Sequence, residues 1–247
     1  MTDDAIAVTG SGSSTSAEWE QQARNWIAWT RAPGLDSYWR YRSDLFEFLP
    51  APGRATLDFG CGEGRLSRDL AEHGHPVTGV DVSATLIDAA REAHPGGDYV
   101  VADCAHTPFA DNSFDLVIAY NSLMDIDDMP GAVREAARLL APGGRLIVSL
   151  LHPANSGRTT GEGDETGFVV DRRYFEHRRT RELDERNGIS MVFASYRRPL
   201  SAYTAALEQA GLLIEAIREP IATRADGSVN PLPWHLWIRA LPNGASA

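Results

Sequence analysis

Between Arg54 and Leu151 the chain alternates short apolar runs with longer amphipathic segments. The apolar runs predict strands, at 55–59, 77–80, 99–101, 114–119 and 145–151. The amphipathic segments predict helices at 64–73, 84–93 and 130–140, with Ser83 capping the second and Pro130 opening the third. Such alternation is typical of a parallel sheet covered by helices on both faces.

The segment before this core has its own pattern. Residues 1–16 are acidic and then rich in Gly, Ser and Thr, a composition that predicts a disordered tail. Residues 17–50 carry an aromatic-rich helical pattern, which Pro33 and Gly34 break into two helices. We expect these helices to form an N-terminal cover of the domain.

The alternation stops after the fifth predicted strand. Residues 152–167 are rich in Gly, Thr and Glu, which predicts a mobile segment. Residues 168–198 read as β-structure, in which Asn187-Gly188 marks a hairpin turn between strands near 178–186 and 189–197. A helix at 200–210 and strands at 212–218 and 234–240 then complete the pattern. We predict one α/β domain over 17–247, a doubly wound and mostly parallel sheet, with 17–50 as a helical cover and 152–198 as an inserted β-hairpin lid.

Charge and cysteine content narrow the choice of partners. The chain has 247 residues and a formal net charge of −11, and such an acidic field repels nucleic-acid phosphates and anionic membrane surfaces. Its two cysteines, Cys61 and Cys104, and the lack of Cys/His metal spacing indicate a reducing, cytoplasmic setting and no structural metal. The N-terminus has no secretory pattern.

The strongest chemical signal is the stretch Leu57-Asp58-Phe59-Gly60-Cys61-Gly62-Glu63-Gly64, which ends a strand and opens a helix. Glycines at such a turn let the backbone approach a ligand closely. A dinucleotide site would have G-x-G-x-x-G spacing, whereas here it is G-x-G-x-G. Asp58 and Glu63 would also repel a pyrophosphate. The loop therefore favours a ligand without phosphate and with net positive charge, such as S-adenosylmethionine.

Two further acids follow the next two strands. Asp81 ends the second strand, where a carboxylate can accept hydrogen bonds from both hydroxyls of an adenosine ribose. Asp103 follows the third strand and can accept from an adenine amino group, while the Cys104 N–H can donate to the ring. Each acid can also be an ordinary loop or helix cap.

The whole set of motifs resembles the class I S-adenosylmethionine-dependent methyltransferases, especially the small-molecule group that includes quinone and natural-product enzymes. The matching stretches are LDFGCGEGRL at 57–66, VTGVDVSATLIDAA at 77–90, YVVADCAHTPFADNSFDLVIAYNSLMDIDD at 99–128, ARLLAPGGRLIVSLLHP at 137–153 and YRRPLSAYTAALEQAGLLIEAIREP at 196–220. The resemblance implies a seven-stranded sheet whose last strand is antiparallel.

The resemblance also implies roles for matching positions. Asp58, Gly60 and Gly62 would surround the methionine part of the cofactor, Asp81 the ribose, and Asp103 and Cys104 the adenine. Tyr120, Asn121 and Ser122 would lie beneath the sulfonium. The predicted cofactor site also includes the neighbouring Cys61, Gly64, Val82 and Ala105. Because Tyr120-Asn121-Ser122-Leu123 stands where amide and nucleobase methyltransferases carry their Pro-Pro-Tyr signature, a small-molecule acceptor is favoured.

The acceptor side is less defined. Trp26, Trp29 and Tyr38 can line its pocket, or they can only pack the helices onto the sheet. His152 follows the fifth predicted strand and is a candidate proton acceptor, with Tyr120 and His177 as alternatives.

The sequence leaves two rival functions open. One is a dinucleotide-dependent oxidoreductase, which the glycine spacing disfavours. The other is a non-catalytic binding module on the same fold.

Overall fold

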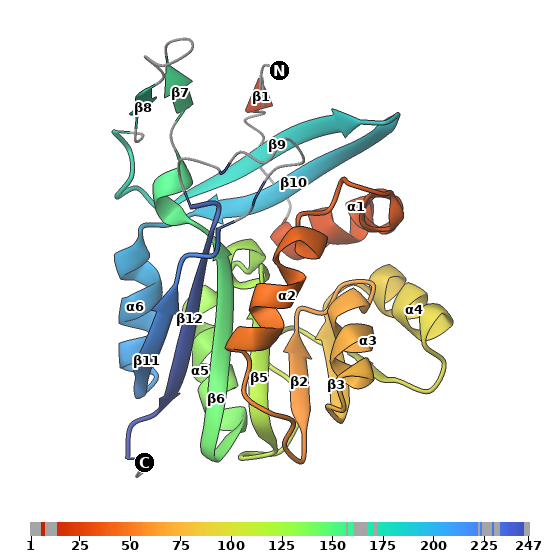
Figure 1. The fold of residues 1–247 in the computed structure, drawn as a ribbon, viewed down its shortest axis with the longest axis vertical. Helices are drawn as coiled ribbons and strands as arrows, with labels where there is room; N and C mark the ends of the chain where they lie inside the picture. Colours follow the sequence, from red (N-terminus) through yellow and green to blue (C-terminus); the bar gives the residue numbers. More distant parts are fainter. Residues whose placement is uncertain are drawn as a thin grey trace.

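The computed structural model describes residues 6–7, 14–156, 158–160, 167–169, 172–221, 223, 229 and 233–244. Seven of its strands form one sheet in the order β11-β12-β6-β5-β2-β3-β4 (Figure 1). Their bounds are β2 (Thr56–Phe59), β3 (Val77–Asp81), β4 (Asp98–Val101), β5 (Phe114–Tyr120), β6 (Leu140–Leu151), β11 (Leu212–Arg218) and β12 (His235–Pro242). β2 to β6 are parallel and β12 is antiparallel to both neighbours, which confirms the predicted fold class.

Helices cover both faces of this sheet. They are α2 (Tyr38–Phe48), α3 (Arg65–Glu72), α4 (Ala84–Ala93), α5 (Met129–Leu139) and α6 (Leu200–Gln209). The first helix, α1 (Thr15–Arg31), packs instead against α4 and against the strand at 189–197. The period of two along β5 sends Val117 and Ala119 to the core shared with α5 and α6, while Leu116 and Ile118 face α2 and α3. Burial on both faces explains why β5 reads as a continuous apolar run.

The chain order places a topological switch at the middle of the sheet. From β2 the chain builds outward through β3 and β4, and then returns to β5 on the other side of β2. Ligands of open α/β sheets bind at the carboxyl ends of the strands beside such a switch. The loops after β2 and β5 therefore define where a site is expected.

The predicted hairpin has the predicted limits. β9 (Arg178–Arg186) and β10 (Ile189–Arg197) pair antiparallel, and Asn187 and Gly188 form the turn with φ of 53° and 77°. Figure 1 shows the hairpin beside α1, at the end of the molecule where β2 and β5 lead into their loops. β1 (Ile6–Ala7) also pairs with β9, and β7 (Arg158–Thr160) pairs with β8 (Gly167–Val169).

Three predicted limits need correction. The predicted tail is wrong at its end, because Ser14 caps α1 by accepting from the Ala17 N–H, so the helix begins at Thr15. It is also wrong at Ile6–Ala7, which pairs with β9, while residues 1–5 and 8–13 lie outside the described residues.

The other two limits surround α5. The helix α5 begins at Met129, one residue before the predicted start at Pro130. Asp128 caps it, with its Oδ1 accepting from the Gly131 N–H at 2.9 Å. β6 begins at Leu140 instead of Arg145, because Leu140 already pairs with Phe114 across the ladder.

Candidate functional site

The glycine-rich loop between β2 and α3 has a backbone that only glycine adopts easily. Gly60, Gly62 and Gly64 have φ of 84°, 56° and 79°. A Cβ on Gly60 would lie 2.4 Å from the Ser122 Cβ, and one on Gly64 would lie 2.9 Å from the Ala90 Cβ. The loop is thus pressed against the end of β5 and against α4, as a close-approach binding loop requires.

Asp81 joins this loop to the end of β3. Its carboxylate accepts from the Gly62 N–H and the Ser83 N–H, both at 2.9 Å. A carboxylate offers about four acceptor positions, so two remain for a ligand diol. Beside it, Glu20 of α1 accepts from the Ser83 hydroxyl at 2.5 Å and from Thr85, which brings a second acid to the same place. Burial raises the pKa of Asp81.

Asp58 is buried beneath the loop. Its Oδ2 accepts from the Ser67 hydroxyl at 2.6 Å. Burial raises the pKa of Asp58 to about 7, against the lowering effects of Ser67 and Arg65. A cation that reached Asp58 would therefore stabilise its ionised form. Glu63, the other acid of the motif, is occupied by Arg68 at 2.9 Å and Arg31 at 3.6 Å and has a structural role.

The loops after β4 and β5 complete the edge. The Asp103 carboxylate accepts from the Ala105 N–H at 2.8 Å, a local turn that leaves its second oxygen for another partner. Asn121 has φ of 54° and accepts from the Ser149 hydroxyl at 2.8 Å, and the Ser122 hydroxyl donates to the Phe59 carbonyl at 2.6 Å. Val82 is 41% exposed at the same edge. The cofactor residues named from the sequence thus occupy adjoining loops.

Both thiols are buried, and burial raises the pKa of Cys61 and of Cys104 well above the ordinary value. Neither thiol is therefore suited to nucleophilic catalysis. The predicted cofactor contacts of Cys61 and Cys104 are therefore contacts of their backbone groups.

The three aromatic residues of the N-terminal cover have different positions. The Trp26 Nε1 would lie 3.3 Å from a Cβ on Gly62, so this ring covers the glycine loop. Trp29 is buried against Phe193 of the hairpin, with ring centroids 5.5 Å apart. Tyr38 is buried against Tyr120 at 5.5 Å, and its hydroxyl donates to Asp69. Of the three, Trp26 is best placed to touch a ligand.

The candidate proton acceptors have unfavourable surroundings. The His152 Nδ1 accepts from the Ala154 N–H at 3.1 Å, which leaves Nε2 to donate to Glu219 at 2.9 Å, so both nitrogens are engaged. Burial raises the pKa of Tyr120, whose hydroxyl has no hydrogen-bond partner among the described residues. His177 is exposed beside α5 and α6, in a hollow with Met129 and Ala206. A base role for these three residues stays a prediction.

Sequence reasoning missed two charged groups near the site. Arg65 opens α3, pairs with Asp36, and has its guanidinium 5.1 Å from the Trp26 ring centroid. Asp125 lies on the short helix η1 (Leu123–Asp125), and its buried Oδ1 has no partner among the described residues. Burial raises the pKa of Asp125 well above the ordinary value, against the lowering effect of Arg198, and Asp81 adds to the rise. Both lie inside stretches that resemble the methyltransferases, but only the fold shows what their side chains contact.

Metal-binding clusters and membrane-spanning helices are both absent from the described part of the chain. No group of three or more His, Cys, Asp or Glu side chains in it is arranged to hold a metal ion. No described helix is both long and apolar enough to cross a membrane.

Known proteins resemble this chain over the same region. A family profile described as a methyltransferase domain matches residues 57–148. Demethylmenaquinone methyltransferase from Beutenbergia cavernae is 34% identical over 116 residues, which cover 47% of this chain and 48% of that protein. Malonyl-[acyl-carrier protein] O-methyltransferase from Pectobacterium atrosepticum is 34% identical over 108 residues, covering 43% of each. The chain thus spans less than half the length of these curated relatives.

Solved structures match over more of the chain. An S-adenosylmethionine-dependent methyltransferase from Mesorhizobium loti superimposes with a TM-score of 0.65 and 25% identity, covering 81% of this chain and 97% of that one. The CcbJ methyltransferase from Streptomyces caelestis gives a TM-score of 0.65 at 22% identity, with 88% and 96% covered. The second match bears on the fold alone.

Proposed function

We propose that the protein transfers a methyl group from S-adenosylmethionine to a small-molecule acceptor, a proposal supported by the match of residues 57–148 to a methyltransferase domain profile. The observation that carries this proposal is the glycine loop joined to Asp81, with Gly60 against Ser122 and Gly62 bonded to the Asp81 carboxylate. The three glycines of the loop let a ligand approach the backbone closely. The acids beside them favour a cationic nucleoside and would repel a pyrophosphate.

The residues present fit this cofactor. The two remaining acceptor positions of Asp81 suit the ribose hydroxyls, and the buried Asp58 suits the ammonium group. Arg65 and the Tyr120 hydroxyl, which has no partner among the described residues, offer donors on the side where the methionine carboxylate would lie. Asp103 and the Cys104 N–H would contact the adenine.

S-adenosylmethionine, when bound, supplies an electrophilic methyl group on a sulfonium. The protein's own contribution is then to orient the acceptor and exclude water. Trp26 of α1 covers the glycine loop and contacts Phe193 of the hairpin, and this cover supports the exclusion of water. The lid role of 152–198 and a cytoplasmic location belong to the same proposal, the location being supported by two buried free thiols.

Binding of S-adenosylhomocysteine, the reaction product, should raise the melting temperature. At about 100 times its Kd, a ligand that binds only the native state adds about 2.7 kcal/mol. For a chain of this size that corresponds to roughly 5–10 °C in calorimetry. NAD should produce no shift. A shift with NAD and none with S-adenosylhomocysteine would contradict the proposal and favour the oxidoreductase. Release of S-adenosylhomocysteine only when an acceptor is added separates an enzyme from a binding module.

Cofactor affinity should rise with pH through the titration of Asp58. The pKa of Asp58 is about 7 in the ligand-free protein, so its carboxyl group is mostly protonated below pH 7. Binding of the ammonium group then requires the loss of that proton. The Kd for S-adenosylhomocysteine at pH 6 should therefore be roughly tenfold weaker than at pH 8. Titration calorimetry at both values checks this, with Asp58→Asn as the variant that should lose the difference. Equal affinities at both values in the unmodified protein would remove Asp58 from the ammonium site.

A further inference from the structure

One carboxyl group at the edge of the proposed site has a buried oxygen without a partner in the described part of the chain. It is Asp125 Oδ1, on η1, three residues after Ser122. Buried acceptors without a donor are rare in native proteins, and each one calls for a specific reason. The residue as a whole is only partly buried, so it is not sealed off from the carboxyl edge of the sheet where ligands bind.

The strand order places Asp125 and Asp81 on opposite sides of the glycine loop. β2 lies between β5 and β3, and Asp125 follows β5 whereas Asp81 ends β3. The Asp125 N–H donates to the Ser122 carbonyl at 2.9 Å, and the Ser122 hydroxyl donates to Phe59 at the start of the loop. A cofactor whose ribose binds Asp81 therefore extends across the loop toward the side of Asp125.

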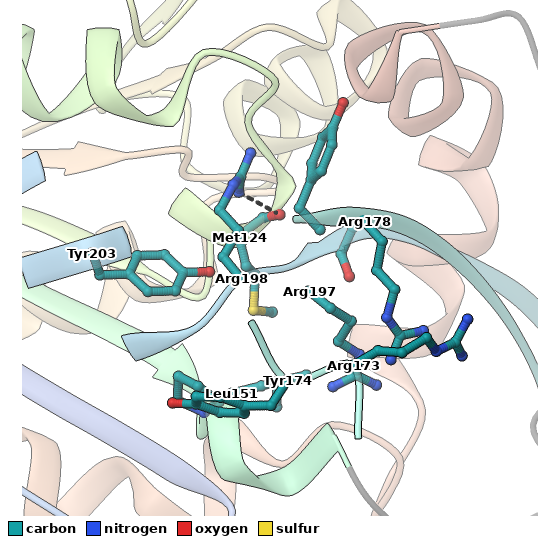
Figure 2. A pocket seen from close by; sticks show the side chains of 11 residues that line it. Met124, Leu151, Arg173, Tyr174, Arg178, Arg197, Arg198 and Tyr203 are labelled. Carbon is teal, nitrogen blue, oxygen red and sulfur yellow. Dashed lines mark hydrogen bonds between the residues drawn. The ribbon is translucent and has the colours of Figure 1, made fainter. Parts of the chain in front are cut away.

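The backbone on both sides of Asp125 is held by one buried arginine. The Arg198 guanidinium donates to the carbonyls of Leu123 at 3.2 Å, Met124 at 3.4 Å, Ile126 at 2.7 Å and Asp127 at 3.4 Å. Figure 2 shows Arg198 with its bond to the Met124 carbonyl. These bonds fix the segment that carries Asp125, as a group that must meet a ligand in one geometry requires.

The charges around Asp125 suit a proton acceptor. The groups that act on it come from the surrounding elements: Asp81 of β3, Arg198 after β10 and Tyr203 of α6. Burial raises the pKa of Asp125, Arg198 lowers it and Asp81 adds to the rise. Burial also raises the pKa of Tyr203, so this phenol stays neutral. A carboxylate with a raised pKa binds a proton more tightly than an ordinary one and is a stronger base.

We propose that Asp125 contacts the methyl acceptor, accepts a hydrogen bond from an O–H or N–H at its reacting atom, and takes that proton during methyl transfer. The inference rests on the proposed function and deepens it by naming the acceptor class. It also offers a catalytic residue other than His152, Tyr120 and His177.

In the proposed step, the lone pair of the acceptor oxygen or nitrogen forms the bond to the methyl carbon. The bond from that carbon to sulfur breaks, and its electron pair stays on sulfur. The proton passes to the Asp125 carboxylate and from there to water. An acceptor that reacts through a carboxylate would be repelled by Asp125, so the proposal favours hydroxyl and amine acceptors.

Two cofactor analogues test this without knowledge of the acceptor. Sinefungin carries a protonated amine where S-adenosylmethionine carries its methyl group, and S-adenosylhomocysteine carries nothing there. Titration calorimetry on the full chain should show that Asp125→Asn weakens sinefungin at least tenfold and changes S-adenosylhomocysteine less than twofold. Asp88→Asn, in which the replaced side chain is 71% exposed, should change neither affinity.

The pH dependence tests the proton. In the unmodified protein the ratio of sinefungin affinity to S-adenosylhomocysteine affinity should fall at least threefold from pH 8 to pH 5, because protonation of Asp125 removes the partner of the amine. The titration of Asp58 affects both ligands and cancels in this ratio. In Asp125→Asn the ratio should not change with pH.

An equal loss of both ligands in Asp125→Asn, or no loss of sinefungin, would overturn the contact. A ratio that is independent of pH in the unmodified protein would overturn the proton transfer, and this series needs no folded variant. Both results leave the proposed function standing. Failure of the unmodified protein to bind S-adenosylhomocysteine would instead remove the proposed function.

Discussion

Asp81→Ala is expected to weaken the binding of S-adenosylhomocysteine by about 2–4 kcal/mol, the cost of losing charge-assisted hydrogen bonds to a buried ligand. The structure adds a second reason for a large effect. The same carboxylate accepts from the Gly62 N–H, so its removal also releases the glycine loop. Titration calorimetry on the folded variant measures the change.

Substitutions of two other acids provide the comparison for the Asp81→Ala result. Asp103→Ala should cost only about 1–2 kcal/mol, because a single contact to the adenine amino group is lost. Asp88→Ala removes an acid of α4 whose side chain is 71% exposed, and should leave the affinity unchanged. If Asp81→Ala bound as tightly as Asp88→Ala, the ribose role would have to be abandoned.

The site on the glycine loop could be predicted because its causes are local. Gly60, Gly62 and Gly64 adopt positive φ within one turn, and Asp81 and Asp103 simply follow strands whose order the apolar runs reveal. Such short-range patterns can be recognised in the sequence without knowledge of the tertiary contacts. The hairpin at Asn187-Gly188 was predictable for the same reason.

Contacts between distant segments could not be predicted in this way. The Trp19 indole donates to the Ala194 carbonyl at 3.1 Å, and Trp26 meets Phe193 at 6.1 Å, although each pair is far apart in the sequence. The sequence shows aromatic helices and a hairpin but not that they pack together. The same holds for Met124, Leu151 and Arg178, which line one pocket only when the sheet and hairpin are assembled.

The charges of the hairpin illustrate this limit. From the sequence, its arginines and acids nearly cancel, and a solvated face is the simplest expectation. In the fold these charges find partners both inside and outside the hairpin. Arg197 pairs with Glu182 and Arg186 with Asp184, whereas Arg179 and Arg181 pair with Glu18 of α1. A net count over a segment therefore does not show which partners its charges find.

Gly60→Ala should be the most damaging substitution in the loop. Alanine at φ of 84° costs about 1–2 kcal/mol, and its Cβ would lie 2.4 Å from the Ser122 Cβ, an overlap that adds about 1–3 kcal/mol. Unfolding in urea should show the sum of the two, and cofactor affinity should fall with it because the loop must move away from β5.

Two further variants separate these causes. Gly143 has φ of 78° with nothing within 4 Å of the place a Cβ would take, so Gly143→Ala isolates the backbone cost of about 1–2 kcal/mol. Ser122→Gly removes the atom that the new Cβ of Gly60→Ala would strike, although it also deletes the hydrogen bond to the Phe59 carbonyl. In the Gly60→Ala background it should restore part of the lost stability, whereas alone it should destabilise. If Gly60→Ala were no worse than Gly143→Ala, the close approach of the loop to β5 would be refuted, and with it the shape of the cradle on which cofactor binding depends.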